Sequence, residues 1–296
     1  MKLAKIINRV LSVVNVAITR RSGLEALRSE AAGAQSLAEL RKELLRHQTA
    51  VKWELVDFLE KKIPQETGHR SCPLCGYAGD EKTFMVFEAQ CLFGGGQLIR
   101  HQCPACDLIF GADKMFGLSS AELSQDYEWH YSMYEEGDST GQEVRAFHCL
   151  NPVREGVYLN YGAGSWSRSV QQLRDDGWNI VAYEPHRSAS SGEGSVISSR
   201  ESLLSMKFDG IFSNNLLEHL RTPVDEVKFM STLLKPGGRM AHATPCFDYL
   251  YEYTRFHLFF FLGRSRNLLA SKAGMVVDNM ICDGEFICCV MSKDIL

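Results

Sequence analysis

Four cysteines stand in two pairs with the spacing C-x-x-C: Cys72 with Cys75, and Cys103 with Cys106. Two intervening residues let one tight turn direct both thiolates of a pair at a single ion, and zinc prefers four such soft ligands in a tetrahedron. A redox pair, the alternative, would need one motif on a thioredoxin-like unit, whereas both pairs here lie in proline-containing turns. Because four thiolates leave no open position around the ion, the pattern predicts a structural zinc site.

A glycine loop is the second feature with chemical meaning, in the stretch "YLNYGAGSW" at residues 158–166. Gly162 and Gly164 follow an apolar run, and glycine at the end of a buried strand lets the backbone approach a ligand closely. Glu184 stands at the end of the next apolar run, where an acidic residue accepts hydrogen bonds from ribose hydroxyls. Trp166 stands close to where a dinucleotide fingerprint would have its third glycine. The two features together predict a ligand that carries a ribose.

The elements that must position these residues alternate between two patterns from residue 155 onward. Apolar runs such as "GVYLNY", "NIVAYE" and "FDGIFSN" are typical of buried strands, and they are separated by helical patterns such as "PVDEVKFMSTLL". This alternation predicts an open parallel sheet with crossover helices. The final runs, "GMVVDNM" and "EFICCVMSK", predict an antiparallel pair that closes the sheet.

The N-terminal part of the chain is predicted to be helical. Apolar residues follow helical spacing over residues 1–20 and are flanked by basic residues, so this segment packs either on protein, its own or a partner subunit, or on a membrane surface. Ser36 and Glu39 form a capping-box pattern, which predicts a second helix to about Lys62. Its leucine-rich face comprises Leu37, Leu40, Leu44, Val51, Leu55 and Leu59.

Composition limits the classes of function. The 296 residues carry a net charge of −4, which argues against a dedicated nucleic-acid binder. Ten cysteines without the framework of a small secreted domain favour a reducing compartment, so we expect a cytoplasmic protein, with residues 1–20 as a peripheral contact if they meet the inner membrane surface.

The motifs "YLNYGAGSW", "VAYEP", "FDGIFSNNLLEHL" and "LLKPGG" resemble, in order and spacing, those of class I S-adenosylmethionine-dependent methyltransferases. The resemblance extends over about residues 155–292. "CPLC" and "CPACDLIF" are similar to the zinc module of bacterial small-molecule and sugar methyltransferases. The resemblance implies an α/β fold: a Rossmann-like sheet with helices on both faces, preceded by N-terminal helices and a small zinc-ribbon-like module. It implies a helical region at 1–66, a zinc-binding module at 67–115, a linker or lid at 116–152 and a methyltransferase domain at 153–296.

The resemblance also implies a set of site residues. For S-adenosylmethionine they are Asn160, Gly162, Ala163, Gly164, Glu184, Asn214 and Asn215. The family usually has an acidic residue where Asn160 stands, so this chain lacks that charge for the cofactor's ammonium group. His219 is the first candidate base, with lining of the pocket as its alternative. His257 is the second candidate, with a buried structural histidine as its alternative.

The expected function is methyl transfer from S-adenosylmethionine to a small molecule, on a hydroxyl or carbon of a sugar or a sugar-polymer precursor. The sugar comes from the resemblance alone. One alternative is a non-catalytic binding or assembly protein that retains the fold. A zinc-containing RNA methyltransferase is the other, and the net negative charge argues against it.

Overall fold

The computed structural model describes residues 33, 35–62, 68–134, 137–164, 168–185, 196–250 and 253–293. The amphipathic segment predicted at residues 1–20 and the side chain of Trp166 lie outside the described residues, so the structure does not test them.

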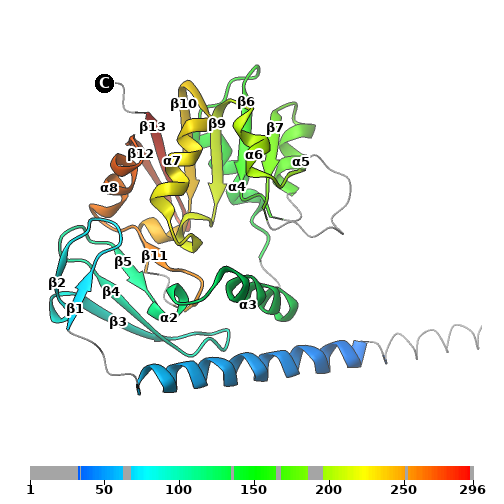
Figure 1. The fold of residues 1–296 in the computed structure, drawn as a ribbon. Coiled ribbons are helices and arrows are strands. Elements are labelled where there is room, and N and C mark those ends of the chain that lie inside the picture. The colour runs from blue at the N-terminus through cyan, green and yellow to red at the C-terminus, as the bar shows by residue number, and fades with distance from the viewer. Residues whose placement is uncertain are drawn as a thin grey trace, which may run out of the picture.

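A seven-stranded sheet forms the centre of the C-terminal half (Figure 1), in the order β12-β13-β10-β9-β6-β7-β8. The strands are β6 (Val157–Tyr161), β7 (Asn179–Tyr183), β8 (Val196–Ile197), β9 (Phe208–Asn214), β10 (Leu234–Ala243), β12 (Met275–Asp283) and β13 (Phe286–Lys293). The strands from β6 to β10 pair in parallel, whereas β13 is antiparallel to both β10 and β12. Counted from β6, the parallel strands follow the 3-2-1-4-5 order of the doubly wound fold, whose switch point lies between β6 and β9.

Helices cover both faces of this sheet, which confirms the predicted fold class. They are α4 (Thr140–Cys149), α5 (Arg168–Asp175), α6 (Arg200–Leu204), α7 (Pro223–Leu233) and α8 (Ser265–Lys272). On one face, Phe147 of α4 and Leu173 of α5 pack in a cluster with Phe212 of β9. On the other face, Val227 of α7 and Leu269 of α8 belong to a second cluster. Burial on both faces explains why the parallel strands are continuous apolar runs rather than alternating ones.

The cysteine module contains two small sheets. One pairs β1 (His69–Ser71) with β2 (Ala78–Asp80), followed by the short turn η1 (Glu81–Thr83). The other sheet has the order β11-β5-β4-β3 and consists of β3 (Met85–Gln90), β4 (Gln97–Gln102), β5 (Ile109–Gly111) and β11 (Phe259–Phe260). Strand β5 is followed in the chain by α2 (Asp113–Phe116). Strand β11 belongs to the C-terminal half of the chain, so this sheet joins the module to the larger domain.

A long N-terminal helix, residues 35–60, runs below the module and α3 (Ser120–Met133), drawn in blue in Figure 1. The predicted capping box at Ser36 is wrong, because the helix already includes Gln35, a good helix former. Trp53 faces inward and is fully buried, and its Nε1 donates to Asp126 Oδ1 at 3.3 Å. The predicted leucine-rich face points the other way: Leu44 is 58% exposed and Val51 63%. Within the described residues, no helix is apolar over a long enough stretch to span a bilayer.

Candidate functional site

The four predicted zinc ligands converge in the module. The Sγ atoms of Cys72 and Cys106 lie 3.6 Å apart, and those of Cys75 and Cys103 lie 3.5 Å apart. All four sulfur atoms lie within 4.8 Å of one another. A tetrahedral zinc ion with bonds of about 2.3 Å places its sulfur ligands about 3.8 Å apart, so the donor set fits this ion.

The two turns that carry the cysteines are built alike. The amide of Gly76 donates to Cys72 O, and the amide of Asp107 donates to Cys103 O, both at 3.0 Å. Gly76 and Asp107 both have positive φ, 78° and 67°. Asp107 tolerates this conformation while its carboxylate accepts from Arg264 Nε at 2.9 Å, and the guanidinium holds the pKa of Asp107 at about 2. Arg264 precedes α8, so this ion pair ties the second turn to the larger domain.

The glycine loop lies at the end of β6 and is closed by Glu184. The amides of Gly162 and Ala163 both donate to Tyr183 O, at 2.9 and 3.0 Å, and the amide of Gly164 donates to Glu184 Oε2 at 3.0 Å. Gly162 and Gly164 have φ of 80° and 67°. A Cβ added at Gly164 would meet no atom of the described residues within 4 Å, so the outer side of the loop is open. The structure therefore brings the glycines and the acidic residue together as the sequence predicts.

Asn160 is buried beside a carboxylate that the sequence analysis missed. Its Nδ2 donates to Glu143 Oε2 at 3.0 Å, and Ser169 Oγ donates to the same oxygen. Glu143 lies on α4, before the first strand of the sheet, so no local motif connects it with Asn160. The negative charge expected at the end of β6 is thus present, supplied by a neighbouring helix.

Asn214 and Asn215 lie at the end of β9, next to the glycine loop. Asn215 has a φ of 48°, and its amide donates to Ala243 O at the end of β10. Leu216 follows and packs on the loop: a Cβ added at Gly162 would lie 3.0 Å from Leu216 Cδ1. The ends of β6, β7, β9 and β10 therefore form one continuous border, which we call the carboxyl edge.

His219 lies on this edge in η2 (Leu217–His219), and its partner comes from α3. The Nδ1 atom of His219 lies 3.2 Å from the hydroxyl of Tyr127. Burial lowers the pKa of His219 to about 4, so its imidazole is neutral at pH 7. The sequence analysis did not single out Tyr127, because nothing close to it in the chain connects it with His219.

His257, the second candidate base, lies beside His219, with ring centroids 4.9 Å apart. Its Nδ1 faces the thiol of Cys246 at 3.5 Å. Glu218, next to His219 in the chain, is fully buried and accepts from Thr244 Oγ1 at 2.5 Å. Burial raises the pKa of Glu218 to about 7. These residues extend the carboxyl edge toward the module.

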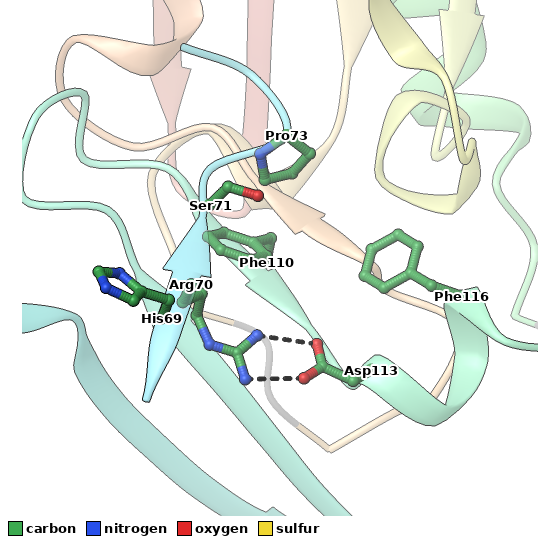
Figure 2. A pocket seen from close by; sticks show the side chains of 7 residues that line it. All are labelled: His69, Arg70, Ser71, Pro73, Phe110, Asp113 and Phe116. Carbon is green, nitrogen blue, oxygen red and sulfur yellow. Dashed lines mark hydrogen bonds and ion pairs between the residues drawn. The ribbon is translucent and has the colours of Figure 1, made fainter. Parts of the chain in front are cut away.

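A cavity of about 330 Å³ lies elsewhere, on the surface of the cysteine module (Figure 2), between Pro73, Phe110 and Phe116. Its one guanidinium, Arg70, is bound twice by Asp113, at 2.8 and 3.1 Å. Because that charge is already paired and none of the lining residues belongs to the carboxyl edge, we do not assign this cavity to the reaction.

The fold and the edge define a doubly wound domain with a nucleotide-type loop, and a family comparison gives its class. Residues 145–282 match the family model of a methyltransferase domain. This part of the chain is therefore similar to a methyltransferase domain, in agreement with the predicted class of enzyme. A comparison with curated protein sequences finds no match.

Solved structures with a similar fold include three methyltransferases. The 1,6-didemethyltoxoflavin-N1-methyltransferase of Burkholderia thailandensis is 13% identical, with a TM-score of 0.48, over 67% of this chain and 96% of that protein. A methyltransferase of calicheamicin biosynthesis is 13% identical, with a TM-score of 0.43, over 62% and 60%. An O-methyltransferase of neocarzinostatin biosynthesis is 16% identical, with a TM-score of 0.43, over 59% and 58%. The present chain thus spans less than two thirds of the last two proteins.

Proposed function

We propose that this chain transfers a methyl group from S-adenosylmethionine to a small-molecule acceptor, at a hydroxyl or a carbon. One observation carries the proposal: the domain that matches methyltransferases has, at the end of its first strand, a glycine loop bound by the carboxylate of Glu184 at 3.0 Å. An acidic residue at this position of a doubly wound sheet binds ribose hydroxyls.

The residues at the carboxyl edge fit such a cofactor. Gly162 and Gly164 let the backbone approach it, and Glu184 faces the loop from β7. Glu143, paired with Asn160, supplies a carboxylate for the ammonium group of the amino-acid part. S-adenosylmethionine supplies a methyl group that its sulfonium already activates, so the protein's task is to bind and align.

His219 is the residue we assign to proton transfer. A hydroxyl or carbon acceptor must lose a proton when it is methylated, and a neutral imidazole is able to take it. The low pKa that burial gives to His219 keeps it neutral at pH 7, and the hydroxyl of Tyr127 orients the ring through Nδ1. Tyr127 thus acts as a positioning residue.

The acceptor is expected to be a sugar or sugar-polymer precursor, and this expectation rests on the resemblance of the zinc module and the methyltransferase motifs. We propose that the four cysteines hold a structural zinc ion, because their spacing fits a tetrahedral site with no open position. We also propose a reducing compartment such as the cytoplasm, because the ten cysteines lack the framework of a small secreted domain.

Calorimetric titration of the full chain with S-adenosylmethionine tests the proposal. We expect saturable binding that the Glu184→Gln variant weakens and the Glu155→Gln variant, an exposed residue of the same domain, leaves unchanged. If the chain did not bind the cofactor at millimolar concentration, the proposed enzymatic function would be refuted. If binding is found, mass spectrometry of a ligand that co-purifies with the protein would identify the acceptor.

A non-catalytic assembly protein is the second candidate, and the N-terminal helix favours it. Leu40, Leu44 and Val51 are each more than half exposed on one face of this helix. Such an apolar stripe is typical of a protein contact. Sedimentation of the full chain and of Leu44→Glu, with Glu43→Gln as control, would support this function only if the stripe mediates association and the cofactor titration is negative.

A further inference from the structure

Three side chains of metal-ligand type meet at the carboxyl edge, apart from the four-cysteine cluster. They are the carboxylate of Glu218, the thiol of Cys246 and the imidazole of His257, and one ligand atom of each lies within 4.8 Å of the others. Glu218 and Cys246 are fully buried, and His257 is partly buried.

The three residues come from separate elements that backbone hydrogen bonds hold together. Glu218 lies in η2 after β9, and Cys246 lies in η3 (Pro245–Phe247) after β10. The amide of Leu258 donates to Glu218 O at 2.7 Å, and the amide of Phe261 donates to Cys246 O at 2.8 Å. The segment that carries His257 is thus fixed against both turns, so the three side chains are positioned in advance.

The distance between two of the donors fits a metal ion. Cys246 Sγ and His257 Nδ1 lie 3.5 Å apart. A tetrahedral zinc ion, with bonds of about 2.3 Å to sulfur and 2.0–2.1 Å to nitrogen, separates such ligands by about 3.5 Å. The pair therefore has the separation that a shared ion requires.

Glu218 provides an independent indication of a ligand. Its Oε1 accepts from Thr244, whereas Oε2 is buried and has no hydrogen-bond partner among the described residues. An unpartnered buried carboxylate oxygen is costly, and a bound cation would satisfy it. Thr244 then has the role of an outer partner that orients the ligating carboxylate.

One fixed cation, Arg100, lies near this cluster, and its donors are engaged elsewhere. Its guanidinium donates to Thr254 O at 2.6 Å and to His257 O at 3.2 Å, and it stacks over Phe260. Burial raises the pKa of the Cys246 thiol and the charge of Arg100 opposes that rise, so a bound cation must itself displace the thiol proton.

We propose that Glu218, Cys246 and His257 bind a divalent cation of the zinc class, at a second metal site with three protein ligands. Carboxylate, thiolate and imidazole together select a cation of intermediate softness. Binding releases the proton of the Cys246 thiol, and the fourth position is left to water or to an acceptor oxygen. His257 is then a ligand, and His219 alone remains as the proposed base. Metal binding at this site does not depend on the proposed function.

Titration of the metal-free full chain with Co²⁺, followed by absorption spectroscopy, tests the proposal, because thiolate ligands give charge-transfer bands. We expect two equivalents per chain. Glu218→Gln, Cys246→Ser and His257→Gln should each weaken the second by about 100-fold or more and leave the first intact. Cys282→Ser, at an exposed cysteine outside both clusters, is the matched control.

Zinc analysis after dialysis provides the second measurement, with circular dichroism as the check on folding. Glu218→Gln is nearly isosteric, so it keeps the comparison valid if a cysteine variant fails to fold. Binding of a single equivalent by the wild-type chain would overturn the proposal, as would a second equivalent that all three variants retain. Neither measurement uses methyl transfer, so a failed cofactor titration leaves them interpretable.

Discussion

The four-cysteine cluster and the carboxyl edge both gather functional side chains, but they are built on different scales. In the cluster, each half is one short turn, and the amides of Gly76 and Asp107 close the two turns in the same way. At the edge, Glu143 of α4 meets Asn160 of β6, and Tyr127 of α3 meets His219 of η2. Soft ligands for one ion can be specified by local turns, whereas a pocket for a large cofactor and its acceptor has to be assembled from distant elements.

The difference has a chemical side as well. As the proposed zinc ligands, the four cysteines form a closed set with no open position, so we expect them to contribute to stability. Among the described residues the edge has open space beside Gly164, and it holds a neutral histidine, His219, and a buried carboxyl group, Glu218, whose pKa values burial shifts. Changes in the cluster should therefore affect folding first, and changes at the edge should affect binding and catalysis first.

The largest effect is expected from Cys103→Ser, which removes one of the four proposed thiolate ligands. Zinc binding to such sites contributes on the order of 10 kcal/mol to folding, so we expect loss of the metal and melting of the module. Metal analysis and thermal unfolding of the full chain measure this, with Cys282→Ser as the control at an exposed cysteine. A variant that keeps one zinc per chain and an unchanged melting temperature would break the comparison.

At the edge, His219→Gln should reduce kcat by about 10²- to 10⁴-fold, the usual contribution of a general base, and leave the Kd of the cofactor nearly unchanged. Tyr127→Phe should reduce kcat less, because it removes only the hydroxyl that orients the ring. Single-turnover rates and calorimetry separate the two quantities. An equal loss in cofactor affinity would show that His219 lines the pocket instead of acting on protons.

We expect acid to lower the stability of the fold through a histidine that is buried beneath the carboxyl edge. His242 on β10 is fully buried, and burial lowers its pKa from 6.5 to about 4. Below pH 6.5 His242 binds a proton in the unfolded chain, whereas in the folded chain it stays neutral down to about pH 4. The stability of the fold therefore decreases as the pH drops from 6.5 to 4. We expect this histidine to contribute a loss of about 2 kcal/mol between pH 7 and pH 5.

Urea unfolding of the wild type and of His242→Asn at the two pH values measures this contribution. The wild type should lose more stability than the variant, and the difference between the two losses is the share of His242. Equal losses in both proteins would assign the acid sensitivity to other groups, among them His130, whose pKa burial also lowers to about 4.

The smallest and most specific effect is expected at the pair of Glu143 and Asn160, where the helix supplies the carboxylate and the strand supplies the amide. Glu143→Gln should weaken cofactor binding by about tenfold, because it removes one charge-assisted contact. Asn160→Asp alone should destabilise the fold, since it places two carboxylates side by side. The double variant Glu143→Gln with Asn160→Asp restores one acid and one amide, so we expect it to recover affinity. Calorimetry of all four proteins measures the coupling, and purely additive losses would contradict the assigned role.

Part of this molecule was predictable because the signals are local. The spacing of the cysteines indicated their convergence. The apolar runs indicated the sheet, and Gly162, Gly164 and Glu184 at the ends of two of these runs indicated its loop. The N-terminal helix shows the limit of such patterns: its leucine-rich face was predicted correctly as a stripe, yet the structure exposes Leu44 and buries Trp53. A periodic pattern reveals that a helix has two faces, but it does not state which face meets the protein.

The sequence by itself determined which segments form strands and helices, and it determined the two cysteine turns, because each depends on residues close together in the chain. Only the tertiary structure decided which polar groups became partners. Glu143 reaches Asn160, Tyr127 reaches His219, and Glu218, Cys246 and His257 meet, since parallel strands end at one edge and the loops that follow fold over it. Those encounters depend on packing across the sheet, which no local spacing encodes.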